Sequence, residues 1–98
     1  MDLIFEWDAK KARNNIEKHK ISFEEACTVF HDPLLLTFPD ELHSETEDRF
    51  LSIGMSERER ILLVVHTEQD ERDDRIIIRI ISCRKATLSE RKIYEKYQ

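Results

Sequence analysis

The sequence of 98 residues contains little glycine, proline or cysteine, and each scarcity excludes a class of protein. One glycine and two prolines are too few for a long flexible linker, so we expect one domain over residues 1–98. Cys27 and Cys83 are far apart and match no disulfide framework or zinc-binding spacing. We therefore expect both cysteines to be buried, small apolar residues in a reducing compartment.

Long apolar runs and metal-ligand motifs are also missing. No run approaches the roughly 20 apolar residues that span a bilayer, and the N-terminus lacks the basic start of a signal peptide. We therefore expect a cytoplasmic protein without a membrane partner. Four histidines show none of the spacings that hold zinc, so we expect no metal and no other cofactor: His19, His31, His43 and His66.

The formal net charge of −5 argues at first against a nucleic-acid partner, but the charges are unevenly distributed. Residues 10–20 and 75–98 are both basic, whereas residues 21–74 are strongly acidic. If the two ends meet in space, they form a local positive patch on an acidic protein. On composition alone, solvated helix faces are the simpler explanation.

The N-terminal third predicts a strand and two helices. Residues 3–7 form the expected strand, and Asp8 is a plausible N-cap of the first helix. Ser22 and Glu25 have the spacing of a capping box at the start of the second helix. Pro33 ends that helix, because proline disfavours helical geometry in the residue before it.

The remaining sequence predicts four strands and a final helix. The strands are expected over residues 34–38, 49–55, 61–67 and 75–84. Gly54 indicates a bulge, and the acidic residues 68–74 indicate a long connection between strands. A second capping box, Thr87 with Glu90, begins a helix that runs to about Tyr97.

This order, β-α-α-β-β-β-β-α, places helices at both ends and consecutive strands between them. Such a pattern favours an α+β fold, with two N-terminal helices and one C-terminal helix on an antiparallel sheet of about four to five strands.

Short blocks of residues, in a fixed order along nearly the whole chain, match a known family. The N-terminal blocks are Phe5-Glu6-Trp7-Asp8, Lys11, Asn15, Lys18-His19, Ser22-Phe23-Glu24-Glu25-Ala26, Val29-Phe30 and Asp32-Pro33. The C-terminal blocks are Ile53-Gly54, Val64-Val65-His66-Thr67, Arg79-Ile80-Ile81-Ser82, Arg84, Ala86-Thr87, Glu90-Arg91 and Tyr94-Glu95. Together they resemble the BrnT family of type II toxins.

The resemblance implies a RelE-like fold, RNA cleavage that stalls translation, and neutralisation by a cognate antitoxin. Antitoxins of this family resemble ribbon-helix-helix proteins, so operator DNA is contacted only through the antitoxin. Such complexes usually hold two toxins and two antitoxins.

Two features depart from the family pattern. Lys20 stands where the family usually has glycine, which would cap a helix in the left-handed conformation at no steric cost. The acidic residues 68–74 look longer than usual and would repel RNA or alter partner docking. Both features bear on how active this member is.

RNA cleavage without a metal needs a base for the 2′-hydroxyl, an acid for the leaving oxygen, and cations around the phosphate. Arg79 is the first candidate for the phosphate, because it interrupts an isoleucine-rich strand. The alternative is an arginine that reaches the edge or pairs with an acid such as Glu90. Arg84 would share the face of Arg79 only if a bulge or twist occurred near Ser82 and Cys83.

Three residues are candidates for proton transfer, each with a structural alternative. His19 ends a helix in a basic segment, where an imidazole can also simply interact with the helix dipole. His66 can equally be a core histidine. Tyr94 can donate a proton or stack on a base, although such a residue is more often half-buried core.

The candidate RNA-binding residues are basic or aromatic, namely Lys11, Lys18, Trp7, Arg49 and Arg91. A core position is the simpler role for Trp7. Two other functions stay open: a non-catalytic co-repressor that only joins a DNA-binding partner, and a degenerate toxin that keeps its antitoxin interface.

Overall fold

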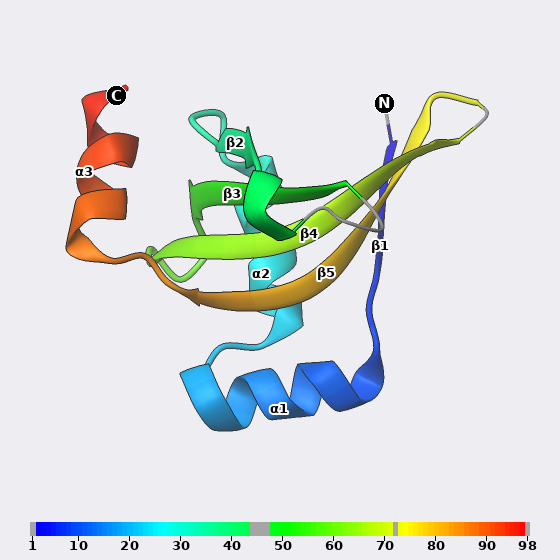
Figure 1. The fold of residues 1–98 in the computed structure, drawn as a ribbon, viewed down its shortest axis with the longest axis horizontal. Coiled ribbons are helices and arrows are strands. Elements are labelled where there is room, and N and C mark those ends of the chain that lie inside the picture. The colour runs from blue at the N-terminus through cyan, green and yellow to red at the C-terminus, as the bar shows by residue number, and fades with distance from the viewer. Residues whose placement is uncertain (1, 44–47, 72, 98) are drawn as a thin grey trace.

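A five-stranded sheet with the strand order β1-β5-β4-β3-β2 lies at the centre of the computed structural model, which describes residues 2–43, 48–71 and 73–97 (Figure 1). Its strands are β1 (Asp2–Glu6), β2 (Leu36–Pro39), β3 (Arg49–Met55), β4 (Ile61–Glu71) and β5 (Arg75–Lys85). The helices are α1 (Ala9–His19), α2 (Phe23–Thr28) and α3 (Leu88–Lys96). The predicted α+β class and element order are confirmed, and two short 3-10 helices are added at Val29–His31 and Glu41–His43.

The sheet is mixed, which corrects the expectation of a purely antiparallel sheet. Strands β2 to β5 pair antiparallel, whereas β1 runs parallel to β5, with Asp2 opposite Arg75 and Glu6 opposite Arg79. A parallel pair needs a long connection, and here most of the chain lies between the two strands. The basic segments near the two ends of the sequence are thereby brought together.

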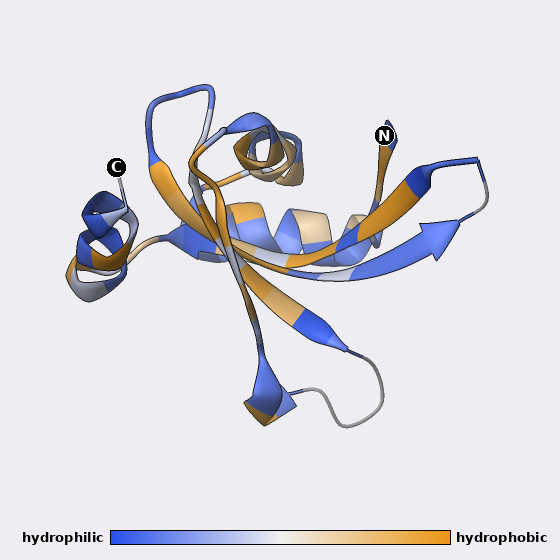
Figure 2. Ribbon diagram, turned by 90° about the horizontal axis from the view of Figure 1, so that it is seen from above, coloured by the Kyte–Doolittle hydropathy of each residue, from blue (hydrophilic) through white to orange (hydrophobic). Residues whose placement is uncertain are grey.

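Helices α1 and α2 cover one face of the sheet, and the main core lies between the helices and the strands. The alternation along β4 and β5 turns their apolar side chains toward this layer. Figure 2 shows these apolar stretches of the sheet in orange and the hydrophilic end of β4 in blue. Each fully buried aliphatic or aromatic side chain stabilises the folded state by about 1.5–3 kcal/mol. The buried residues of this layer are Ile21, Phe23, Ala26, Val29, Leu62, Val64, Ile78, Ile80 and Cys83.

On the opposite face of the sheet, called the open face below, α3 packs at one end. There Tyr94 of α3 packs with Ile53 and Leu63, and its hydroxyl donates a 2.6 Å hydrogen bond to Asp32 Oδ2. Asp32 also accepts from the backbone N–H of Met55 at 2.8 Å. These bonds hold α3 to the sheet.

The ends of α1 follow the sequence signals. Asp8 Oδ2 accepts from the N–H of Lys11 at 3.0 Å. At the other end, Lys20 has φ 61° and ψ 31°, and its N–H donates to Ile16 O. The expected left-handed cap is therefore confirmed. Lysine carries a Cβ that crowds this conformation, at a cost of about 1–2 kcal/mol.

The two predicted capping boxes have different outcomes. Thr87 and Glu90 form both bonds of the box at the start of α3. At α2, Ser22 accepts from the N–H of Glu25, but the Glu25 carboxylate does not return to Ser22. It binds Arg60 instead, so that box is only half formed.

The acidic residues 68–74 do not form the predicted long connection. Strand β4 continues to Glu71, and β5 begins at Arg75, so most of the acidic segment is paired strand in a projecting hairpin. The side chains of residues 69–71 are exposed and lose little solvation there, while their backbone gains ladder hydrogen bonds. Asp73 and Asp74 turn the chain with φ of 66° and 61°.

Gly54 marks a close approach rather than the predicted bulge. The β3–β4 register runs regularly through Gly54 and Leu62. A Cβ on Gly54 would lie 2.9 Å from Leu35 Cδ1 and 3.2 Å from Val29 Cβ, so glycine lets these segments pack on the strand. The bulge lies elsewhere, in β5.

Candidate functional site

A bulge in β5 brings the two predicted arginines to one face of the sheet. Val65 pairs with Ser82 and His66 pairs with Ile80, which leaves Ile81 as an extra residue. Ile80 and Cys83 consequently both point into the helix-covered core. The intervening shift turns Arg79 and Arg84 to the open face, although an odd number of positions separates them. A shared face of Arg79 and Arg84 was expected to require such a bulge.

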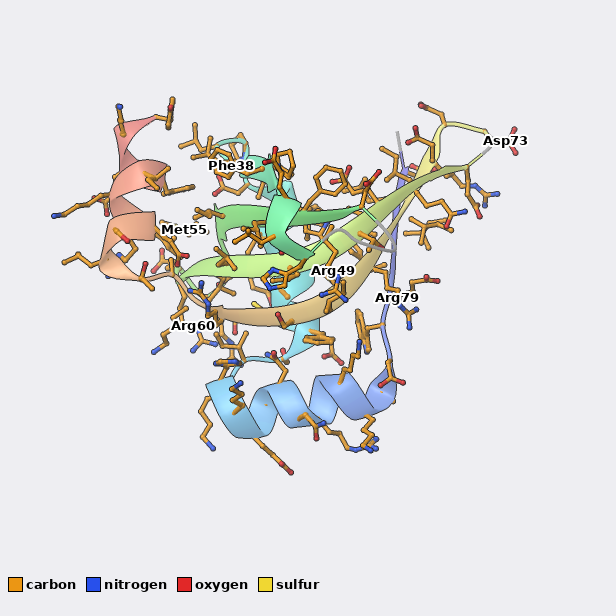
Figure 3. The ribbon with its side chains drawn as sticks, viewed as in Figure 1. Phe38, Arg49, Met55, Arg60, Asp73 and Arg79 are labelled. Atoms are coloured by element: carbon orange, nitrogen blue, oxygen red, sulfur yellow. The ribbon has the colours of Figure 1, made fainter. Side chains whose placement is uncertain are left out.

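Arg49 joins this arrangement through the register of the sheet. It pairs with Thr67 on β4, which pairs in turn with Arg79 on β5. Paired residues share a face, so Arg49 and Arg79 lie in one row, about 10 Å apart at their Cα atoms. Figure 3 shows both side chains on this part of the sheet, whereas Arg60 lies toward the other end.

A cleft of about 420 Å³ lies on the open face between the Glu41–His43 turn and α3. Its floor is apolar and includes Leu51, Leu63 and Val65. Charged and polar side chains surround this floor, namely Asp40, His43, Arg49, Ser82, Arg84 and Glu90. An apolar floor with converging polar groups is typical of ligand sites.

A second hollow of about 300 Å³ lies between α1 and β5, and is called the α1 hollow below. Lys11, Lys18 and His19 line it from the helix, at spacings that place them on one face. Ile81 and Ser82 line both the α1 hollow and the open-face cleft. The bulge is therefore the point at which the two depressions adjoin, and it connects the two predicted basic segments.

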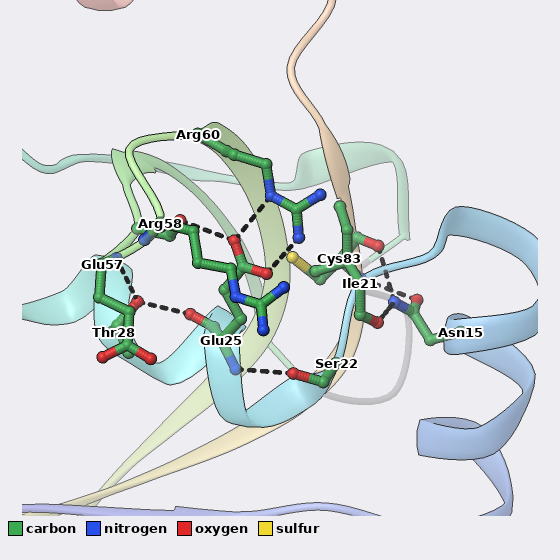
Figure 4. Close-up of polar contacts among 10 residues, drawn as sticks. Asn15, Ile21, Ser22, Glu25, Thr28, Glu57, Arg58, Arg60 and Cys83 are labelled. Carbon is green, nitrogen blue, oxygen red and sulfur yellow. Dashed lines mark hydrogen bonds and ion pairs between the residues drawn. The ribbon is translucent and has the colours of Figure 1, made fainter.

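Asn15 fixes α1 to the edge of β5, where the pairing with β1 has ended (Figure 4). Its amide Nδ2 donates to Cys83 O at 2.8 Å and to Ile21 O at 2.9 Å. Its Oδ1 accepts from the N–H of Cys83 at 3.0 Å. One buried side chain thus replaces a missing strand beside the bulge.

The arginines of the open face differ in how firmly they are held. Arg79 contacts Glu6 at 3.4 Å, and both side chains are about half exposed, so this pair holds Arg79 weakly. Glu6, rather than the predicted Glu90, is therefore the acid beside Arg79. Arg84 donates to both oxygens of Glu90, at 2.7 and 2.9 Å. These bonds lower the pKa of Glu90, which therefore stays a carboxylate.

Arg84 retains donors for a ligand despite this pair. Within the described chain it uses three N–H groups, two toward Glu90 and one toward Lys85 O. A guanidinium has five such donors. Glu90 therefore orients Arg84, and among the described residues two of the five donors have no partner.

His66 lies away from this site. Its side chain is fully buried on the helix-covered side, where it packs edge-on against Phe30 and stacks on Phe50. Nε2 hydrogen-bonds Ser52 Oγ at 2.7 Å. Burial lowers the pKa of His66 to about 4, so the ring is neutral at pH 7. The alternative of a core histidine describes it better than the acid–base role.

Three more candidates lie outside the cleft and the α1 hollow. Tyr94 is 3% exposed, with its hydroxyl committed to Asp32. Trp7 packs edge-on against Phe23 in the core. Arg91 lines a different hollow, beside Arg60. For Tyr94 and Trp7 the structure favours the core alternatives given above.

Sequence reasoning missed an aspartate–histidine pair at the edge of the cleft. His43 Nδ1 lies 3.2 Å from both carboxylate oxygens of Asp40. Asp40 is largely buried, whereas the His43 side chain is 66% exposed. The only available signal was the Asp-x-x-His spacing, in a segment between two predicted strands.

A buried ion pair was missed as well (Figure 4). Glu25 of α2 binds Arg60, and Ser56 donates to Glu25 Oε2 at 2.7 Å. The bond from Arg60 is the main reason that the pKa of Glu25 is lowered despite its burial. This network fastens α2 to the β3–β4 turn and does not reach the open-face cleft.

Other chemistries find little support in the described residues. Burial raises the pKa of Cys27 to about 11 and that of Cys83 to about 12, so neither thiol forms a thiolate nucleophile near neutral pH. No three His, Cys, Asp or Glu side chains in residues 2–43, 48–71 and 73–97 are grouped to hold a metal ion. Within the same ranges, no helix is long and apolar enough to cross a membrane.

Comparisons with a family model and with solved structures both found similar proteins. A family model described as the ribonuclease toxin BrnT of type II toxin-antitoxin systems matches residues 7–90. The fold is similar to the crystal structure of the Brucella abortus ribonuclease toxin BrnT, with a TM-score of 0.62 at 24% sequence identity. That match covers 89% of this chain and 99% of the Brucella protein. No curated protein matches the chain.

Proposed function

Because the chain belongs to the BrnT family of ribonuclease toxins from type II toxin-antitoxin systems, we propose that it is a metal-independent endoribonuclease whose cleavage of RNA inhibits translation. The observation that carries the proposal is the convergence of Arg49, Arg79 and Arg84 on the open face, beside the basic α1 hollow. Planar guanidinium groups suit the charge of a phosphodiester in its transition state.

The proposed roles follow the two adjoining depressions. Arg79 binds the scissile phosphate, because its weak pair with Glu6 is readily exchanged for an anion. Arg84 is oriented by Glu90 and stabilises the same phosphate, and Arg49 contacts the chain alongside. Lys11 and Lys18 bind the RNA backbone in the α1 hollow.

In this proposal, two of the residues predicted from the sequence to transfer protons do not take part. His19 lines the α1 hollow and is the proposed acid that protonates the leaving 5′-oxygen. His66 and Tyr94 receive no such role, because neither is accessible to a substrate. Trp7 and Arg91 are not needed for RNA binding at this site.

The proposed partner is a cognate antitoxin of the ribbon-helix-helix type. In this proposal the complex holds two toxins and two antitoxins, and contacts operator DNA only through the antitoxin. The family's type II classification supports an antitoxin partner. Size-exclusion chromatography with light scattering on a co-expressed pair measures the stoichiometry.

The test is expression of this chain alone in a bacterium, beside Arg79→Ala and a matched control, Arg75→Ala. Arg75 lies on the same strand near the hairpin end, next to Glu71. We expect growth arrest and RNA loss with the wild type and Arg75→Ala. Loss of one charged hydrogen-bond donor costs about 1.5–3 kcal/mol, so cleavage by purified Arg79→Ala should fall about 10–100-fold.

The contrary outcomes point to different functions. Normal growth and intact RNA with abundant, folded wild-type protein would favour a non-catalytic co-repressor or a degenerate toxin. Undiminished cleavage by Arg79→Ala would remove this residue from the phosphate site while leaving the ribonuclease function in place.

A further inference from the structure

The Asp40–His43 pair has the geometry of an oriented acid–base group. The largely buried Asp40 carboxylate lies 3.2 Å from His43 Nδ1 through each of its oxygens. A carboxylate in this position fixes the tautomer, so that Nδ1 carries the hydrogen and Nε2 has the lone pair. With Nδ1 engaged and the side chain 66% exposed, Nε2 is accessible to a ligand in the cleft.

The pair lies at the same cleft as two of the three arginines of the open face. Arg49 and Arg84 line this cleft with His43, over a floor that includes Leu51 and Val65. A phosphodiester held by the guanidinium groups would place its sugar on that floor, within the reach of the turn that carries His43. Among the four histidines, His43 alone lines this cleft.

We propose that His43 is a catalytic residue of the RNA cleavage, acting as the general base, and that Asp40 is its positioning residue. The inference rests on the proposed ribonuclease function and adds a residue that the family resemblance did not include. Imidazole suits the role because it exchanges protons near neutral pH.

The step balances without a metal or cofactor. His43 Nε2 takes the proton of the ribose 2′-hydroxyl, and the 2′-oxygen forms a bond to the adjacent phosphorus. The bond from phosphorus to the 5′-oxygen breaks, and that oxygen takes a proton from His19. The products are a 2′,3′-cyclic phosphate and a free 5′-hydroxyl. The cations around the cleft stabilise the negative charge on the phosphoryl oxygens.

The pH dependence of this base is set by the charges around it. Negative charges of Asp40 on the same turn and Glu90 on α3, and positive charges of Arg49 on β3 and Arg84 on β5, line the cleft with the ring. A neighbouring carboxylate stabilises a protonated imidazole. Removal of the Asp40 charge alone should therefore move the acidic limb of the rate profile to lower pH. A merely structural role for Asp40 would leave that limb in place.

The test uses purified full-length protein and a fluorescently labelled single-stranded RNA of mixed sequence, with rates measured from pH 5 to pH 9. The variants are His43→Gln, Asp40→Asn and a control, His31→Gln, whose exposed ring lines a different hollow. Melting curves verify that each variant is folded. His43→Gly is measured with and without added imidazole, because a small diffusible base can restore a missing general base.

We expect His43→Gln to lower kcat by about 10²–10⁴-fold, with little change in KM and loss of the acidic limb. Asp40→Asn should lower kcat less and shift the limb downward, His31→Gln should match the wild type, and imidazole should partly restore His43→Gly. Cleavage by the wild type that is undiminished in His43→Gln overturns this assignment alone. Absence of cleavage by the folded wild type overturns the ribonuclease function, and the assignment with it.

Discussion

Replacement of Asn15 by alanine should destabilise the protein strongly, because one side chain satisfies three buried backbone groups. The variant would remove the acceptor of the Cys83 N–H and the donors to Cys83 O and Ile21 O. Asn15 is 6% exposed, so water cannot readily replace the amide. Each buried group left without a partner costs about 1–3 kcal/mol, and one cost of about 1 kcal/mol for each gives a loss of about 3 kcal/mol.

A loss of this size is easily measured by thermal unfolding. For a domain of this length, about 1 kcal/mol shifts Tm by roughly 4–8 °C, so Asn15→Ala should melt about 12–24 °C below the wild type. Asn14→Ala is the matched control, since Asn14 is the same residue type one position earlier and is exposed. Circular dichroism at 222 nm follows both variants.

The refuting result is a Tm for Asn15→Ala that lies close to that of Asn14→Ala. It would mean that the edge of β5 holds its conformation without the amide, and that the bulge does not depend on α1. A large loss of stability in both variants would instead place the effect in the helix itself.

Substitutions at two further positions, Lys20 and His66, test other features of the fold. Lys20→Gly should raise the free energy of unfolding by about 1 kcal/mol, because glycine adopts φ 61° without the Cβ clash. Lys20→Ala keeps the Cβ and should not raise it. Urea unfolding measures both variants. His66 has a pKa of about 4 in the folded chain against about 6.5 when unfolded, so the unfolded state binds more protons between these values and stability falls as pH drops. Between pH 7.5 and pH 5, the free energy of unfolding of the wild type should fall by about 2 kcal/mol because of His66, and His66→Gln should lack this fall. Equal pH slopes in the two proteins would contradict the low pKa of the buried ring.

Local signals in the sequence predicted the elements well. The caps Asp8 and Thr87 act through contacts within one helical turn, and both occur as expected. Alternation of apolar residues gave the bounds of β3 without error. The left-handed position of Lys20 was expected only from the family resemblance, because the family usually has glycine there.

Features that depend on distant partners were not predictable in the same way. Composition suggested a connection at residues 68–74, but pairing with β5 makes exposed acidic residues part of a strand. The burial of His66 depends on Phe30 and Phe50, which approach it from other elements. No rule on the sequence alone states that β1 pairs parallel to β5.

In the candidate site too, features set by local sequence were predicted, whereas features that depend on distant partners were not. Arg79 and Arg84 were identified by type and position, but their common face depends on a bulge that sequence patterns did not locate with certainty. The α1 candidates Lys11, Lys18 and His19 do lie together, because helical spacing alone brings them to one side. The Asp40–His43 pair was missed because its geometry arises in a short turn with no periodic signal.

The parallel pairing of β1 with β5 also determines the order in which the molecule can be assembled. Asp2 pairs with Arg75, so the first strand has no partner until 73 further residues have been added. At roughly 5–20 residues per second, synthesis of that stretch takes about 4–15 s. The β3–β4–β5 meander joins neighbours in sequence and closes with little loss of chain entropy. The contact of α1 with β5 is therefore completed late, and a newly made chain acquires its full basic surface only after β5 has been synthesised.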